Sequence, residues 1–237
     1  MNSNYDLEAL KKRGFLKARQ EGFFTLRTSV AAGNYQARHL LALENIANKY
    51  ARGFVHLTVR QGIEIPFIKA EDIDKVEQEV KAAGIKTGAS GPRLRATTSC
   101  PGNNWCKRGL VDTFYLFRRI EELGISCGLD LPHKFKIVIS GCPNHCTRAE
   151  TSEIGISGEV DFKSPDKKIG YVVYLGGCGG TAPRVGFKLG KIFNLEEVLL
   201  IVKSVVTLFK VKAKPRQRLA LLIEEIGRDK FLQEIGL

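Results

Sequence analysis

The sequence has 237 residues, of which 43% are hydrophobic and 26% are charged. These proportions are ordinary for a folded globular chain and exclude a disordered or collagen-like protein. Lysine and arginine outnumber aspartate and glutamate by 37 to 25, which gives a formal net charge of +12. Such a charge favours an anionic partner: nucleic acid, an anionic membrane surface, an acidic protein, or an anionic cofactor and substrate.

No segment has the pattern of a membrane span or an export signal. Residues 1–13 are polar and charged, and the longest apolar stretch, residues 198–211, is interrupted by Lys203 and Lys210. Neither segment can act as a signal-peptide core or cross a bilayer. We therefore expect a cytoplasmic protein with no membrane partner, in which six reduced cysteines favour metal binding over disulfide bonds.

The first part of the chain predicts a small α+β unit. The expected elements, in chain order, are a charged helix over residues 1–22, a strand over 23–30, a helix from Asn34 to Gly53, an extended segment over 55–65 and a helix over 71–83. This alternation of strands and helices favours a ferredoxin-like arrangement. Within the extended segment, Val55, Leu57 and Val59 alternate with polar residues, which predicts one buried face and places Arg60 on the polar face.

The second part begins after a join at residues 87–92 that is rich in glycine, serine and proline. We therefore predict one domain over residues 1–86 and a second over 87–237. The elements expected in the second domain are a helix over 104–123, a strand over 135–139, a strand over 170–175, a helix from Asn194 through Phe209 and a helix over 217–235. The fold class is thus α+β.

Two cysteine pairs carry the strongest chemical signal. Cys100 and Cys106 have the spacing C-x5-C, and Cys142 and Cys146 have the spacing C-x3-C. Four thiolates from two short loops are the usual ligands of an iron–sulfur cluster. Zinc also accepts four cysteines, although structural zinc sites favour C-x2-C pairs. Four unligated thiols are the remaining alternative.

The residues around these cysteines resemble the sirohaem-dependent sulfite and nitrite reductases. The resemblance includes Thr97-Thr-Ser-Cys-Pro-Gly, Gly141-Cys-Pro-Asn-His-Cys, His56-Leu-Thr-Val-Arg-Gln, Gly91-Pro-Arg-Leu-Arg, Leu131-Pro-His-Lys-Phe-Lys and Gly176-Gly-Cys-Gly-Gly. It implies an α/β sirohaem and [4Fe–4S] domain after the ferredoxin-like unit. It also implies that Cys100, Cys106 and Cys142 hold only the cluster, whereas Cys146 also bridges to the sirohaem iron. Within the family, the chain is most similar to the small assimilatory-type sulfite reductases of anaerobic prokaryotes.

The same resemblance assigns four basic residues to anion binding and proton delivery: Arg60, Arg95, Lys134 and Lys136. Alternation places both lysines on one face of their strand. Arginine offers a fixed fork to an oxyanion, whereas lysine is a mobile charge that can also donate a proton. The alternative for any one of them is a solvated surface cation.

Sirohaem carries many carboxylates, so further basic or N–H-rich positions are candidates for its binding. These are Arg93, Asn144, Arg148, Gly177, Arg184 and Lys188. Glycine-rich stretches such as the one around Gly177 are most often turns. Cys127 and Cys178 lie outside the motif and are expected in the core, and His145 is expected to be structural.

The implied activity is reduction of sulfite to sulfide with six electrons from an external low-potential donor, such as an acidic ferredoxin. Reduction of nitrite to ammonia on the same centre is an alternative that the sequence does not separate from it. A non-catalytic sirohaem or electron-transfer subunit of a larger complex is a second alternative. No motif supports nucleic-acid binding. Family members combine two halves, and the chain contains one, so we expect a homodimer or a rearranged monomer.

Overall fold

The computed structural model describes residues 5–237, so residues 1–4 of the first predicted helix lie outside the described part. The chain forms two compact units, residues 1–91 and 92–237, that divide between Gly91 and Pro92. The boundary predicted from the sequence lies a few residues earlier, after residue 86.

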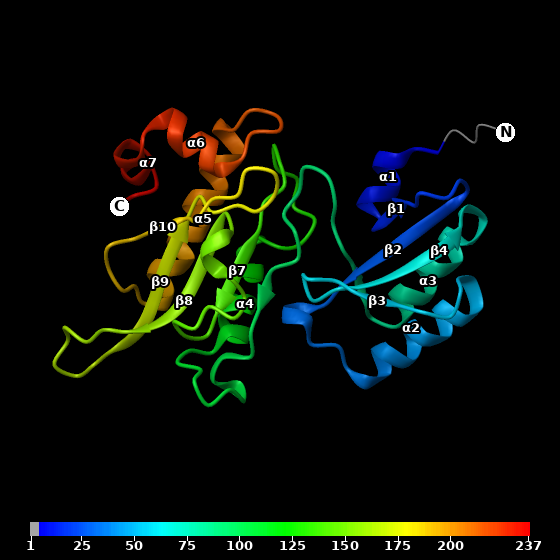
Figure 1. The fold of residues 1–237 in the computed structure, drawn as a ribbon, viewed down its shortest axis with the longest axis horizontal. Helices are drawn as coiled ribbons and strands as arrows, with labels where there is room; N and C mark the ends of the chain where they lie inside the picture. Colours follow the sequence, from blue (N-terminus) through cyan, green and yellow to red (C-terminus); the bar gives the residue numbers. More distant parts are fainter. Residues whose placement is uncertain (1–4) are drawn as a thin grey trace. The chain divides into compact units, whose positions relative to one another are not determined.

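The first unit is a ferredoxin-like α+β fold (Figure 1). Its elements are α1 (Leu7–Lys12), β1 (Phe15–Lys17), β2 (Phe23–Ser29), α2 (Ala37–Tyr50), β3 (His56–Leu57), β4 (Ile63–Lys69), α3 (Ile73–Ala82) and β5 (Lys86–Thr87). The strands form an antiparallel sheet of order β1-β2-β4-β3, with β5 paired to β2. Helices α2 and α3 bury their apolar faces together with this sheet in one core. The predicted ferredoxin-like fold is therefore confirmed.

The single helix predicted over residues 1–22 is wrong beyond Lys12. Helix α1 ends there, and Gly14 adopts a φ of +88° that sends the chain into β1. A Cβ at Gly14 would lie 2.5 Å from the Cβ of Thr87, so the chain passes too close to its neighbour for any other residue. Charge and length alone did not reveal this close approach.

The extended segment predicted over residues 55–65 is also interrupted. Strand β3 contains only His56 and Leu57, and the amide of Thr58 donates to the carbonyl of Gly62 at 2.9 Å, which closes a hairpin turn. Val59 in this turn is 95% exposed, and Leu57 on the edge strand is also exposed. The buried face predicted for residues 55–59 is therefore wrong, and Arg60 lies in the turn.

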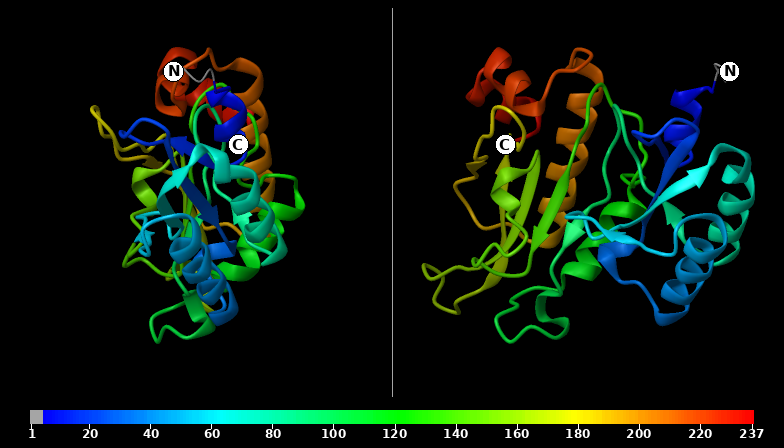
Figure 2. Two further views of the ribbon diagram at one scale, coloured as in Figure 1. Left: turned by 90° about the vertical axis from the view of Figure 1, so that its right-hand side faces the viewer. Right: turned by 45° about the vertical axis from the view of Figure 1, so that its right-hand side comes forward.

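The second unit is built on a mixed sheet. Its elements are β6 (Thr98–Ser99), α4 (Thr113–Glu122), β7 (Ile137–Ser140), β8 (Ile154–Val160), β9 (Ile169–Leu175), β10 (Phe187–Lys188), α5 (Leu195–Lys212), α6 (Leu219–Ile226) and α7 (Arg228–Glu234). The strand order is β10-β9-β8-β7-β6. Strands β6, β7 and β8 are parallel, whereas β9 is antiparallel to both of its neighbours. Helices α4 and α5 lie against one face of this sheet (Figure 2).

One parallel pairing in this sheet determines where the functional side chains lie. Residues 93–99 run beside residues 134–140, through a bridge between Leu94 and Phe135 and through the pairing of β6 with β7. Phe135 is fully buried, and its ring packs on that of Phe209 in α5 at a centroid distance of 5.0 Å. Helix α5 therefore supports the strand pair from the apolar side.

The second unit differs from the sequence predictions at three places. Helix α4 begins nine residues later than expected, because Asp112 caps it by accepting hydrogen bonds from the amides of Phe114 and Tyr115. The predicted C-terminal helix is broken into α6 and α7 at Gly227, whose φ is +87°. Strand β8 was missed because Gly155 and Gly158 weaken its strand propensity.

No helix in the described part of the chain is both long enough and apolar enough to cross a bilayer. Helix α5 has 18 residues, and it carries Lys203, Lys210 and Lys212.

The contact between Phe209 and Phe135 gives a stability prediction. Phe209→Ala removes a fully buried ring and should lower the free energy of unfolding by about 3–5 kcal/mol. Leu200→Ala on the same helix is the matched control, because Leu200 is 65% exposed and its loss should cost less than about 1 kcal/mol. Urea unfolding of the cofactor-free chain, followed by circular dichroism, measures both changes. Equal effects of the two substitutions would contradict this account of the core.

Candidate functional site

The loop after β6 places the first cysteine pair. Cys100 directly follows the strand, and its backbone carbonyl accepts a hydrogen bond from the Thr113 hydroxyl at 2.6 Å. A Cβ at Gly109 would lie 2.1 Å from the carbonyl carbon of Gly102, so two glycines allow the loop to fold on itself. Cys106 is exposed at the outer part of this loop, where its amide donates to the Gly102 carbonyl at 3.2 Å.

The loop after β7 places the second pair. Cys142 is buried, and its carbonyl accepts a hydrogen bond from the Ser157 hydroxyl at 3.0 Å. Cys146 is exposed, and the neighbouring Thr147 hydroxyl is 2.5 Å from that of Ser140, which folds the loop back on the strand end. His145, in the same loop, places Nδ1 2.8 Å from a carboxylate oxygen of Glu150.

The two loops meet where β6 and β7 end. The amide of Gly141 donates to Cys100 Sγ at 3.0 Å, and the Gly141 carbonyl accepts from the amide of Leu110 at 2.8 Å. A Cβ at Gly141 would lie 2.5 Å from the Cα of Gly102, so only glycines permit this approach. The first cysteine of one pair is therefore held beside the first cysteine of the other.

The donor set fits a four-thiolate iron–sulfur cluster. Across residues 5–237, no three cysteine, histidine or acidic side chains are gathered at metal-binding distance. Two of the four thiols are exposed on the loops, and a backbone amide already donates to a third. Amide-to-sulfur hydrogen bonds of this kind stabilise the thiolate ligands of a cluster and tune the cluster's reduction potential. The residues present thus match the cluster in ligand type and number.

A cationic cluster lies at the opposite end of the same strands. Phe135 donates its amide to the Arg93 carbonyl at 3.2 Å and accepts from the amide of Arg95 at 2.8 Å, which brings the Arg95 and Lys134 segments side by side. Burial lowers the pKa of His133, and nearby positive charges lower it further: Arg218, Lys134, Arg95 and Arg216. We call Arg95, His133, Lys134, Lys136, Arg216 and Arg218 the basic cluster.

The basic cluster and the cysteines are separated by the length of the strands. Lys136 and Gly141 flank β7 on its two sides, and at about 3.3 Å per residue they are roughly 16 Å apart. Arg95 and Cys100 are separated in the same way along the parallel segment that pairs with it. Side chains of a strand stand roughly perpendicular to the sheet, so the length of a lysine side chain does not bring its ammonium group to the cysteine loops. Closeness in sequence between Arg95 and Cys100 does not place them together.

The other candidate residues lie in different surroundings. Arg60 lies in the turn of the first unit, whereas Asn144 and Arg148 are exposed in the Cys142–Cys146 region. Three cations form ion pairs within the protein: Arg93 with Asp130 at 2.9 Å, Arg184 with Glu224, and Lys188 with Glu159 at 3.7 Å. A Cβ at Gly177 would lie 2.4 Å from the Glu150 carbonyl, so chain packing alone requires that glycine.

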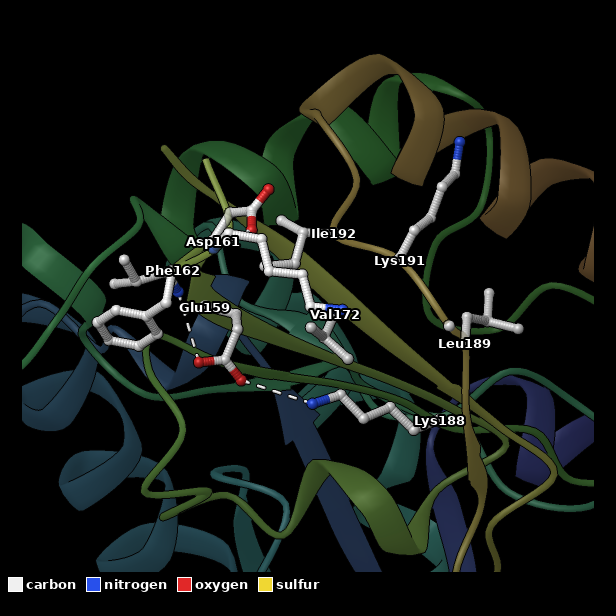
Figure 3. Close-up of a pocket in the computed structure, with 11 residues that line it drawn as sticks. Glu159, Asp161, Phe162, Val172, Lys188, Leu189, Lys191 and Ile192 are labelled. Carbon is white, nitrogen blue, oxygen red and sulfur yellow. Dashed lines mark hydrogen bonds and ion pairs between the residues drawn. The ribbon is translucent and has the colours of Figure 1, made fainter. Parts of the chain in front are cut away.

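Lys188 lines a hollow of about 460 Å³ at the outer part of the second sheet (Figure 3). Its ammonium group points toward Glu159 across the hollow, and Asp161, Lys191 and apolar side chains complete the wall. Acidic and basic groups are mixed here, unlike the cationic environment around His133.

The sequence did not reveal a buried ion pair at the basic cluster. Glu153 is 1% exposed and forms an ion pair with Arg218, which precedes α6. Burial raises the pKa of Glu153, while the charges of Arg218 and Lys136 oppose this rise. The partners are 65 positions apart in the chain, so no local spacing signals the pair.

Two family models match the chain, one in each unit of the fold. Residues 90–237 match the family model described as nitrite and sulphite reductase 4Fe-4S domain. Residues 16–83 match the nitrite/sulfite reductase ferredoxin-like half domain. Together the two matches cover most of the chain and agree with the two units of the fold.

Individual relatives are longer than this chain. It is 29% identical to the coenzyme F420-dependent sulfite reductase of Methanocaldococcus jannaschii, over 94% of this chain and 44% of that protein. It is 28% identical to a nitrite reductase [NAD(P)H] of Emericella nidulans, over 98% of this chain and 20% of that protein. The chain therefore spans less than half the length of both relatives.

A solved structure shows the same fold. The chain superposes on the Mycobacterium tuberculosis NirA protein with a TM-score of 0.80 and 22% identity, over 94% of this chain and 44% of that one. The fold, the cysteine loops and the family model agree. The chain belongs to the nitrite and sulphite reductase family, whose cofactors are sirohaem and a [4Fe–4S] cluster.

Proposed function

We propose that the protein reduces sulfite to sulfide with six electrons from an external low-potential donor. One observation carries this proposal: the parallel pairing of residues 93–99 with 134–140. It presents thiols at the carboxyl end of both strands and cations at the amino end of both. A metal centre that only transfers electrons would need only the thiols, whereas reduction of an oxyanion also needs positive charge and protons.

Four cysteines would hold the metal centre. Cys100, Cys106 and Cys142 are the proposed ligands of the cluster alone, and Cys146 is the proposed bridge to the sirohaem iron. When bound, this coupled centre supplies electrons one at a time to a ligand on the open face of the macrocycle. Asn144 and Arg148 lie in the same loop region and are proposed to bind the periphery of sirohaem.

Three other proposed sirohaem contacts would require existing ion pairs to be exchanged. Arg93, Arg184 and Lys188 each have an acidic partner in the protein. Gly177 is proposed to allow close approach of the macrocycle, although it also packs against Glu150. These four positions are therefore secondary to the cysteines in the proposed site.

The basic residues would bind the substrate and supply protons. Reduction of sulfite to hydrogen sulfide ion consumes six electrons and seven protons and releases three waters. Arg95 offers a guanidinium fork to the sulfite oxygens, and Lys134 and Lys136 are the proposed donors of protons to departing oxygen. Arg60, in its turn, is the proposed fourth member of this set. Bulk water would reprotonate each lysine between steps.

We also propose that two copies of the chain form each site. Cations that bind and protonate the substrate would have to lie close to the metal centre that Cys146 would help to hold. Within one chain they occupy opposite ends of β7. A two-fold dimer can place the basic end of one chain beside the cysteine end of its partner.

Nitrite is the second candidate substrate, because nitrite reductases are among the relatives. Both substrates are small oxyanions that need the same charge and proton supply. The proposed donor is a separate acidic redox protein such as a ferredoxin, because the chain carries a net charge of +12 and opposite charges accelerate association.

Turnover by the anaerobically purified protein tests the proposed function. We expect a tetrapyrrole absorption band, and oxidation of a chemically reduced dye that depends on added sulfite. A higher kcat/KM for nitrite than for sulfite would reassign the substrate. A protein that is loaded with both cofactors and reduces neither anion would contradict the proposal and favour a non-catalytic subunit.

The role of Cys146 predicts a loss of metal. Cys146→Ser removes both a cluster ligand and the bridge, so iron and acid-labile sulfide should fall by more than about half, because serine is a poor ligand for this cluster. Cys127→Ser is the matched control, because Cys127 lies outside both loops. Metal analysis and electron paramagnetic resonance spectra measure the change. A full cluster with unaltered coupling in Cys146→Ser would contradict the assignment.

The role of Lys136 predicts a loss of rate with the cofactors retained. Lys136→Ala should lower kcat by about 100-fold or more, the usual effect of losing a positioned proton donor. Lys203→Ala removes an exposed lysine of α5 and should change kcat by less than about twofold. Absorption spectra verify equal cofactor loading. Unchanged turnover in loaded Lys136→Ala would remove Lys136 from the proposed site.

A further inference from the structure

Glu153 and its neighbour Ile154 together bind both backbone polar groups of Lys136. Its Oε2 accepts a hydrogen bond from the backbone amide of Lys136 at 3.0 Å. The next residue, Ile154, donates its amide to the Lys136 carbonyl at 3.2 Å. The start of β8 thereby fixes the point at which the Lys134–Lys136 segment enters β7.

Arg218 holds the carboxylate in place from the other side. Its guanidinium group forms an ion pair with Glu153 Oε1, and its side chain is 13% exposed. The same loop donates the amide of Arg216 to the carbonyl of Pro132 at 3.2 Å. The loop between α5 and α6 is thus attached to the segment that contains His133 and Lys134, and a buried acid lies at the point of attachment.

The carboxylate also supplies a negative charge where cations crowd together. Arg95, Lys134, Arg216 and Arg218 all act on His133, and Arg218 and Lys136 act on Glu153. Cations this close repel each other, and an anion among them offsets that repulsion. A lone carboxylate would be costly to bury, so Glu153 and Arg218 depend on each other.

We propose that Glu153 is a positioning residue that holds Lys134 and Lys136 for the substrate oxyanion, with Arg218 as its counter-ion. The inference rests on the proposed function, because it gives the lysines the oxyanion as their ligand. Glu153 itself touches neither substrate nor cofactor. It acts through the backbone of Lys136, and its negative charge limits repulsion within the basic cluster.

Two variants separate positioning from stability. Glu153→Leu combined with Arg218→Leu removes the acceptor for the Lys136 amide but leaves no buried lone charge, so the fold should be largely retained. Glu153→Gln keeps an acceptor oxygen for that amide and serves as the conservative variant. Phe231→Leu, at a fully buried position in α7, is the control for general destabilisation.

Hydrogen exchange and kinetics are measured on the same holoenzyme preparations. In the double variant we expect exchange of the Lys136 amide to accelerate about tenfold or more, and KM for sulfite to rise about tenfold, the size expected from one lost hydrogen bond. Glu153→Gln keeps the acceptor but loses the charge, so its KM should rise less than that of the double variant, and Phe231→Leu should leave both quantities unchanged.

The outcomes distinguish this inference from the proposed function. An active wild type with an unchanged KM in the double variant would overturn the positioning role alone. The same holds if exchange at Lys136 is unchanged, or if Phe231→Leu raises KM equally. A cofactor-loaded wild type that reduces neither sulfite nor nitrite would overturn the proposed function and the positioning role together.

Discussion

The parallel pairing of residues 93–99 with 134–140 is the constraint on which the rest of the second unit depends. Parallel strands align their ends, so similar side chains on the two segments gather at the same edge of the sheet. The carboxyl edge receives Cys100 and Cys142, and the amino edge receives Arg95 and Lys134. Helix α5 supports this pair through the contact of Phe209 with Phe135.

The two edges of the sheet are stabilised in different ways. At the cysteine edge, Gly102, Gly109 and Gly141 let two loops approach more closely than side chains would permit. At the basic edge, the buried carboxylate of Glu153 offsets the positive charge of the neighbouring cations. It also accepts a hydrogen bond from the backbone amide of Lys136, directly before β7. The cations at this edge can therefore lie close together while the local fold stays intact.

The sequence predicted what depends on local pattern. Cysteine spacing identified the metal ligands proposed here, and helical periodicity located α5, which the Asn194 capping box begins. The sequence did not predict features that depend on contacts between distant segments. These are the close approach at Gly14, the turn that exposes Val59, and the glycine-containing strand β8. Glu153 and Arg218 escaped notice for the same reason, since only the fold brings them together.

Complementation between two inactive variants tests the two-chain site most directly. Cys146→Ser and Lys136→Ala chains with different tags are co-expressed, and mixed dimers are purified through both tags. If cysteines and lysines come from different chains, each mixed dimer has one intact site and should recover about half of wild-type activity. If both sets act within one chain, every site carries a defect. Doubly tagged dimers that contain sirohaem but show no recovered sulfite reduction would contradict the account.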